Sequence, residues 1–135
     1  MRRMIPVAAL LLFTVKVVAN TEESWYPQQL VAIQYPQLAA QAQVEGVVVI
    51  DCDVGVSVAS VCSPTAGPPL LTDAVMSSVA DWKFAPPCGS SSRSGRFRLV
   101  VDFRLITART TPLRDFRFVW PARAYVEARP MRHSH

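Results

Sequence analysis

The chain has very few residues that could carry out catalysis. Its two histidines, His133 and His135, stand at the C-terminal end, where ordering is least expected. Nucleophilic catalysis needs a base held near a Ser or Cys, and no histidine precedes these two to serve as that base. The three cysteines form no CxxC motif and no cluster with histidine, so no metal site is expected. We therefore expect neither an enzyme nor a cofactor.

The sequence also lacks a basic region within the part expected to fold. The formal charge is +4, yet residues 20–106 carry five Lys/Arg against eight Asp/Glu, and residues 107–135 carry six Arg against two acids. Nucleic-acid binding needs basic charge on a folded face, with aromatic or polar readers around it. Because the central region is mildly acidic, nucleic acid is not expected as a partner.

No apolar run has the length of a typical membrane span. Two arginines precede twelve apolar or small residues, Met4–Val15, and small residues follow Lys16. A spanning helix needs about 20 apolar residues, whereas this pattern is typical of a secretory signal peptide. We expect residues 1–19 to be a signal peptide and the protein to be periplasmic or secreted. The alternative is an uncleaved inner-membrane anchor that contacts the membrane through residues 4–19 and faces the periplasm.

The middle of the chain begins with signals for a short helix and a hairpin. Pro36 suits the first helical position, and Gly46 can cap the helix in the left-handed conformation. Apolar residues then alternate from Val47, as in a half-buried strand, and Val56–Cys62 is expected to return as a second strand. The turn is expected near Gly55–Val58, although neither Asn-Gly nor Asp-Gly occurs there.

A second helix and a third strand follow. Thr72 is a candidate N-cap for a helix expected to end at Trp82-Lys83-Phe84. Residues Arg96–Leu105 alternate apolar and mostly charged side chains, which indicates a strand at the edge of a sheet. Charged side chains discourage uncontrolled pairing there, while the backbone can still accept an extended peptide. The pattern predicts an α+β fold with two short helices packed on a three-stranded antiparallel sheet.

Aromatic side chains alternate with arginines within residues 107–135. The alternation runs from Leu113 to Trp120. We expect an extended tail whose aromatic rings cover part of the sheet, and a fourth strand is the structural alternative. A functional alternative is adhesion to an acidic surface, either anionic lipid or cell-wall polymer, through arginines and interfacial aromatics.

Three cysteines in an exported chain indicate one disulfide and one remaining thiol. If the hairpin turns at Ser57, Cys52 and Cys62 lie opposite each other, at a Cα separation of about 4.5–5.5 Å that a disulfide accepts. A two-residue turn at Val54-Gly55 would place them on opposite faces and favour Cys52 with Cys88 instead. Both pairings remain open on this reasoning.

Between Tyr35 and Leu105 the motifs occur in a recognisable order. They are Tyr35-Pro36 with Ala39 and Ala42, Glu45-Gly46, the alternating Val48, Ile50, Cys52 and Val54, Ala66-Gly67, Leu70-Leu71, Ala74, Val79, Trp82-Lys83-Phe84, Pro86 and the strand from Phe97. This ordered set resembles the C-terminal domain of TonB-type energy transducers. It covers about seventy of the 135 residues.

The resemblance implies a periplasmic domain that pairs its last strand with an extended segment of an outer-membrane receptor. Relatives with a cysteine in each hairpin strand favour the Cys52–Cys62 pairing. The implied partner-facing residues are Arg96, Phe97, Arg98, Leu99, Val100 and Val101, with Tyr35 and Pro36 nearby. Only residues 20–34 would link an anchor to the domain, and they reach roughly 50 Å at most, so we do not expect a stand-alone energy transducer.

These observations predict a signal peptide over 1–19, a lead-in over 20–34, a TonB C-terminal-like domain over 35–106 and a basic aromatic tail over 107–135. The predicted function is binding of a protein partner in the cell envelope, such as an outer-membrane receptor in TonB-type transmembrane transport. A homodimer is left open. The alternative is a structural envelope module that binds membrane or cell wall through the tail.

Overall fold

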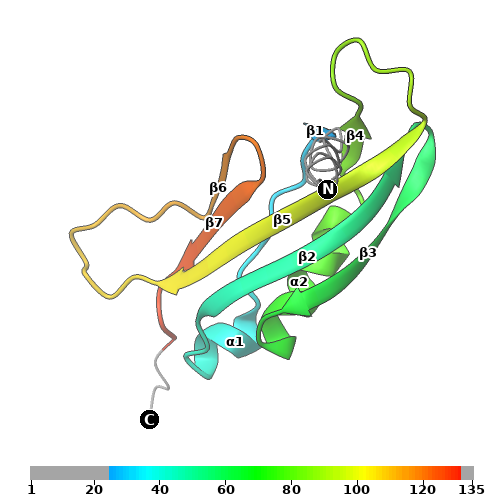
Figure 1. The fold of residues 1–135 in the computed structure, drawn as a ribbon. Coiled ribbons are helices and arrows are strands. Elements are labelled where there is room, and N and C mark those ends of the chain that lie inside the picture. The colour runs from blue at the N-terminus through cyan, green and yellow to red at the C-terminus, as the bar shows by residue number, and fades with distance from the viewer. Residues whose placement is uncertain (1–24, 132–135) are drawn as a thin grey trace, which may run out of the picture.

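The computed structural model describes residues 25–131 (Figure 1). The predicted signal peptide and the two histidines therefore lie outside the described residues. The helices and strands, in chain order, are β1 Tyr26–Gln29, α1 Gln37–Gln41, β2 Gly46–Gly55, β3 Val58–Ala66, α2 Pro69–Val79, β4 Lys83–Ala85, β5 Ser94–Leu105, β6 Phe116–Val119 and β7 Arg123–Ala128.

A five-stranded mixed sheet with the strand order β3-β2-β5-β7-β6 forms the centre of the fold. Strand β2 lies antiparallel to both β3 and β5, β5 pairs in parallel with β7, and β6 pairs antiparallel with β7. The predicted three-stranded antiparallel sheet with an extended tail is therefore wrong. Strands β2, β3 and β5 are the three expected strands, and residues of the expected tail contribute two more.

The expected tail folds because its alternation is that of two short strands with one buried face. Ala124 and Val126 of β7 are 0 % exposed, and Phe116 and Phe118 of β6 pack against the same core. Arg117 pairs with Tyr125 on the other face, which is open to solvent. Burial of these small and aromatic side chains supplies the free energy that holds the hairpin on β5.

A two-stranded antiparallel sheet of β1 and β4 lies over the inner face of the large sheet. The expected lead-in thus contains a strand. Strand β4 also corrects the prediction that the second helix ends at Trp82-Lys83-Phe84, because α2 already ends at Val79. Trp82 and Phe84 are buried and Lys83 between them is exposed, which is the two-residue period of a strand.

Both helices differ from their predicted limits. Helix α2 begins at Pro69 with Pro68 as its N-cap, and the Thr72 hydroxyl donates to the Pro69 carbonyl instead of capping the helix. Helix α1 has only 5 residues, and the left-handed backbone after it occurs at Gln43, with φ 56°, rather than at Gly46. The hairpin turn lies where it was expected, with Ser57 at φ 60°.

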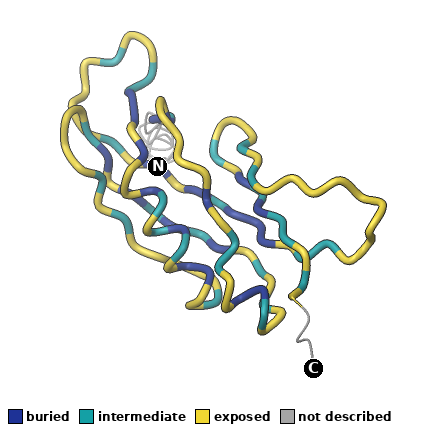
Figure 2. Tube along the Cα trace, turned by 180° about the vertical axis from the view of Figure 1, so that it is seen from behind, coloured by how far each residue is buried: buried dark blue, intermediate teal, exposed yellow. Residues whose placement is uncertain are grey.

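One hydrophobic core lies between the large sheet and the layer of helices and β1–β4. Its largest fully buried side chains are Phe103, Ile33, Ile50, Leu71, Leu99, Val48, Val75, Val79, Val101 and Val126. Figure 2 shows that the buried residues follow the strands and helices, whereas the connecting loops are exposed. The core therefore draws side chains from the expected lead-in, the central region and the expected tail.

Shortening one buried side chain of β7 tests whether the C-terminal hairpin is part of this core. We expect Val126→Ala to lower the free energy of unfolding by about 1–3 kcal/mol, because it removes buried methyl groups and leaves a cavity. Val119→Ala in the same hairpin, at a side chain 38 % exposed, should change it by less than about 0.5 kcal/mol. Urea unfolding followed by circular dichroism measures both. Equal effects would show that the hairpin does not pack as described.

Candidate functional site

Strand β5 has a partner along one side but only a partial partner along the other. Residues Ser94–Phe103 pair with β2 without a register shift. On the opposite side, β7 begins with Arg123 opposite Val100. Within residues 25–131, no strand pairs with Ser94–Leu99 on that side. We call Ser94–Leu99 the open edge of β5.

The backbone of the open edge points its free hydrogen-bonding groups away from β2. The Val100 N–H donates to the Ala122 carbonyl at 3.1 Å, so the backbone groups of Val100 face the β7 side. Successive residues of a strand alternate in this respect, and the register of β5 with β2 is unbroken. The N–H and C=O groups of Arg96 and Arg98 therefore face the side of β5 that β7 covers only from Val100 onward.

The side chains of these two arginines lie on the solvent face and form ion pairs with β2. Arg98 binds Asp51 through two hydrogen bonds, of 2.7 and 3.1 Å. These bonds lower the pKa of Asp51 and raise the pKa of Arg98. Arg96 lies 3.7 Å from Asp53, with both side chains about three-quarters exposed. Exposed pairs of this kind contribute little to stability, so the arginines can exchange these partners for others.

The predicted partner-facing segment divides into three kinds of residue. Arg96 and Arg98 are exposed, and no strand within residues 25–131 pairs with their outward-facing backbone groups. Phe97 and Leu99 point into the core, at 4 % and 0 % exposure, so their side chains cannot contact a partner. The last two residues of the predicted segment, 100–101, are already paired with β7. Strand β5 is thus neither the last strand nor an edge along its whole length.

Tyr35 and Pro36 do not join this site. The Tyr35 ring packs edge-on against Phe103 at 5.3 Å, and its hydroxyl donates to the Val44 carbonyl. Phe103 follows Arg96 by seven residues, which is roughly 23 Å along a strand. The two parts of the predicted partner surface therefore lie toward opposite ends of β5.

An aromatic pair of one half-buried ring and one exposed ring lies near the open edge instead. Gly95 faces the core, where a Cβ would stand 2.1 Å from Nε1 of the buried Trp25, so only glycine admits the indole at this place. The next residue, Tyr26, packs against Trp120 with ring centroids 5.3 Å apart. Trp120 is 62 % exposed. Its sequence signal is weak, because a single Trp-Pro step in the expected tail does not reveal that it meets Tyr26.

A cavity of about 560 Å³ opens at the β2–β3 turn, next to the end of α2 and β4. Its lining includes Val56 and Val58, and its charged lining residues are Asp81 and Lys83. The lining holds no histidine or cysteine. Among the described residues, no group of three or more His, Cys, Asp or Glu side chains is placed to hold a metal ion.

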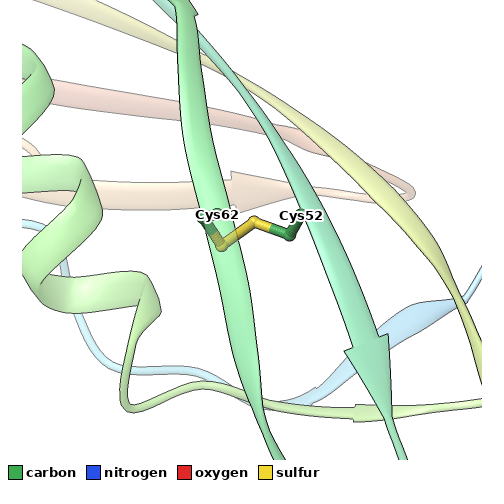
Figure 3. The surroundings of a disulfide bond; sticks show 2 residues. All are labelled: Cys52 and Cys62. Carbon is green, nitrogen blue, oxygen red and sulfur yellow. A yellow bond between two sulfur atoms is a disulfide. The ribbon is translucent and has the colours of Figure 1, made fainter.

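The disulfide joins the two strands of the hairpin, as predicted. Cys52 and Cys62 stand opposite each other in the β2–β3 register, with their Cα atoms 4.0 Å apart and their sulfur atoms bonded (Figure 3). The alternative of Cys52 with Cys88 is wrong, because Cys88 is exposed and carries a free thiol. The turn pairs Gly55 with Val58, and a register shift between Asp53 and Gly55 then brings Cys52 opposite Cys62.

Comparison with protein-family models, curated proteins and solved structures found no match for the chain. The resemblance to TonB C-terminal domains therefore stays a prediction. Among residues 25–131, no helix is both long and apolar enough to cross a membrane.

Removing the disulfide should destabilise the hairpin. It closes a loop with a sequence separation of 10, for which the loss of chain entropy in the unfolded state corresponds to about 2–3 kcal/mol. We expect Cys52→Ala/Cys62→Ala to lower the free energy of unfolding by this amount. Cys88→Ala should leave it unchanged. Urea unfolding with and without a reductant provides the measurement, and a reductant effect on Cys52→Ala/Cys62→Ala would contradict the assignment.

Tyr35 should make stability depend on pH above 10. Burial, with a smaller contribution from Glu45, raises its pKa to about 12, against about 10 in an unfolded chain. Its stabilising contribution is therefore complete below pH 10 and is lost as the pH rises to 12. We expect Tyr35→Phe to cost about 1 kcal/mol at pH 7, and this difference from the unsubstituted protein to shrink between pH 10 and 12. A difference independent of pH would refute the assignment.

Proposed function

We propose that this protein is a protein-binding module that takes up an extended segment of a partner along the open edge of β5. The observation that carries the proposal is the half-length pairing of β5 with β7, which leaves Ser94–Leu99 unpaired on one side. An unpaired strand edge is a template for strand addition, in which main-chain hydrogen bonds give affinity and side-chain contacts give specificity.

The energetics favour a short peptide with additional side-chain contacts. Arg96 and Arg98 together offer two N–H donors and two carbonyl acceptors, which are worth about 2–6 kcal/mol in net hydrogen bonding. That range alone corresponds to weak binding. The exposed Trp120, packed on the half-buried Tyr26, provides aromatic surface near the same edge, so apolar side chains of the partner can add to the affinity.

The partner is proposed to belong to the cell envelope. The signal-peptide pattern of residues 1–19 and the Cys52–Cys62 disulfide support this placement, because disulfides persist in oxidising compartments. A segment of an outer-membrane transport protein is the kind of partner that the resemblance implies. The sequence from 20 to 34 still argues against action as a stand-alone energy transducer.

Site-specific photocrosslinking tests where a partner binds. A photoreactive amino acid is placed at Arg96 or Ser94 on the open edge, and at Ser63 or Thr65 on β3, which is the outer strand at the other side of the sheet. We expect a crosslinked partner only from the open edge. Crosslinks that form only from β3 would assign binding to the opposite side of the sheet.

A backbone substitution then tests strand addition with the crosslinked segment as a synthetic peptide. Arg96→Pro removes the free N–H, which edge positions tolerate when the donor faces solvent, and we expect about tenfold weaker binding. Arg96→Ser removes the same side chain but keeps the N–H, so it should bind nearly as well. Equal affinities for the two variants, both folded by circular dichroism, would show that the backbone of the open edge is not used.

A further inference from the structure

The turn between β6 and β7 carries exposed apolar and cationic side chains side by side. Val119 is 38 % and Trp120 is 62 % exposed, and Arg123 stands opposite Val119 in the register of the hairpin. Arg117 lies two residues before Val119 on the same face. We call Arg117, Val119, Trp120 and Arg123 the hairpin tip.

The two arginines of the hairpin tip pack on an aromatic ring, and no salt bridge joins them to a carboxylate within residues 25–131. The guanidinium carbons of Arg117 and Arg123 lie 4.5 and 5.7 Å from the centroid of the Tyr125 ring. Among the described residues, the salt bridges involve other arginines. A guanidinium that stacks on a ring keeps the N–H donors at its edge free for an oxyanion.

Trp120 is presented outward at the same place. Its ring packs on Tyr26, which keeps the indole at the surface instead of in the core. The cavity at the β2–β3 turn includes no residue of the hairpin tip. In Figure 1 the β6–β7 turn projects from the sheet toward the same end as the β1–β4 ribbon. A projecting turn with an exposed indole suits a broad surface better than a chain that needs a groove.

We propose that the hairpin tip docks on an anionic lipid surface. Trp120 and Val119 enter the headgroup region, and Arg117 and Arg123 bind lipid phosphates. Tryptophan prefers this region because its body is apolar and its N–H is polar, and each arginine near an anionic surface adds electrostatic attraction. The proposal shares Trp120 with strand addition but uses none of the backbone groups of the open edge, so peptide binding by Arg96→Pro and lipid docking by Arg117→Ser/Arg123→Ser test the two proposals separately.

The chain length upstream is consistent with this placement. The apolar run Met4–Val15 ends eleven residues before Tyr26, and an extended segment of that length reaches at most about 40 Å. Since Tyr26 packs on Trp120, a bilayer that held the apolar run would lie within reach of the hairpin tip. The charge of residues 107–135, six Arg against two acids, also complements anionic headgroups.

Tryptophan quenching by brominated lipid tests the proposal in the full chain. Trp25 and Trp82 are 2 % and 4 % exposed and provide an unquenched background, so Trp120 reports the contact. We expect quenching in vesicles of phosphatidylcholine with phosphatidylglycerol, little in phosphatidylcholine alone, and none from Trp120→Phe. Equal quenching in the two vesicle types, or quenching that persists in Trp120→Phe, would overturn the proposal.

Matched arginine variants identify the charges involved. Arg117→Ser/Arg123→Ser should lower the ratio of docked to undocked protein about 30-fold, at about fivefold per arginine. Arg109→Ser/Arg114→Ser removes the same charge from the exposed loop before β6 and should have little effect. Equal losses from both pairs would refute a specific site. Raising the salt concentration from 0.05 to 1 M should also abolish the quenching. This test uses the unsubstituted protein, so it does not depend on whether a variant folds.

An acidic polypeptide is the rival ligand for the same charges. Soluble polyglutamate should not change Trp120 fluorescence in the concentration range over which the vesicles do, because it offers no interface for the indole. A change with polyglutamate and none with vesicles that contain phosphatidylglycerol would assign the hairpin tip to an acidic protein and overturn the lipid proposal.

Discussion

The packing of the strands and of the segment before α1 depends on the buried indole of Trp82. Its N–H donates to the Val31 carbonyl at 2.8 Å, which fixes the segment before α1. Its ring contacts Phe84 of β4, Phe97 of β5 and Phe118 of β6, with centroids 5.9–6.5 Å apart. One buried side chain thus connects four parts of the chain that are distant in sequence. The expected tail joins this cluster through Phe118, and the expected lead-in is held by the hydrogen bond from Trp82 to Val31.

Long strands could be predicted from the alternation of their apolar residues, whereas strands of three or four residues could not. The β2–β3 hairpin and a turn within residues 55–58 follow from the alternation that begins at Val47. The Cys52–Cys62 pairing does not follow from that alternation alone, because it depends on a register shift between Asp53 and Gly55. Strand β4 has 3 residues and β6 has 4, too few for a period to be distinguished from the end of a helix or an extended tail. Strand β7 buries Ala124 and Val126, whose small side chains give a weak apolar signal. The tail was therefore expected to be extended, although its strand β7 pairs in parallel with β5.

The candidate site could be predicted in part for the same reason. The alternation of Arg96–Leu105 shows which side chains face solvent, and Arg96 and Arg98 do so. Which backbone groups are free depends on where β7 begins, and that position is set by the packing of Phe118 and Ala124 against the core. Local sequence does not encode such long-range pairing. The Tyr26–Trp120 pair was missed because its two rings come from opposite ends of the described chain.

The parallel pairing of β5 with β7 has a consequence for how the protein is made. Chains emerge from the ribosome N-terminus first, and β7 is the last strand to appear. Until it docks, β5 exposes its edge over 100–105 as well as the open edge, beside the apolar Val101 and Phe103. An unpaired edge of that length with an apolar face is prone to pair with another copy. The C-terminal hairpin therefore shortens this aggregation-prone edge by pairing with residues 100–105, while the open edge keeps no strand partner within residues 25–131.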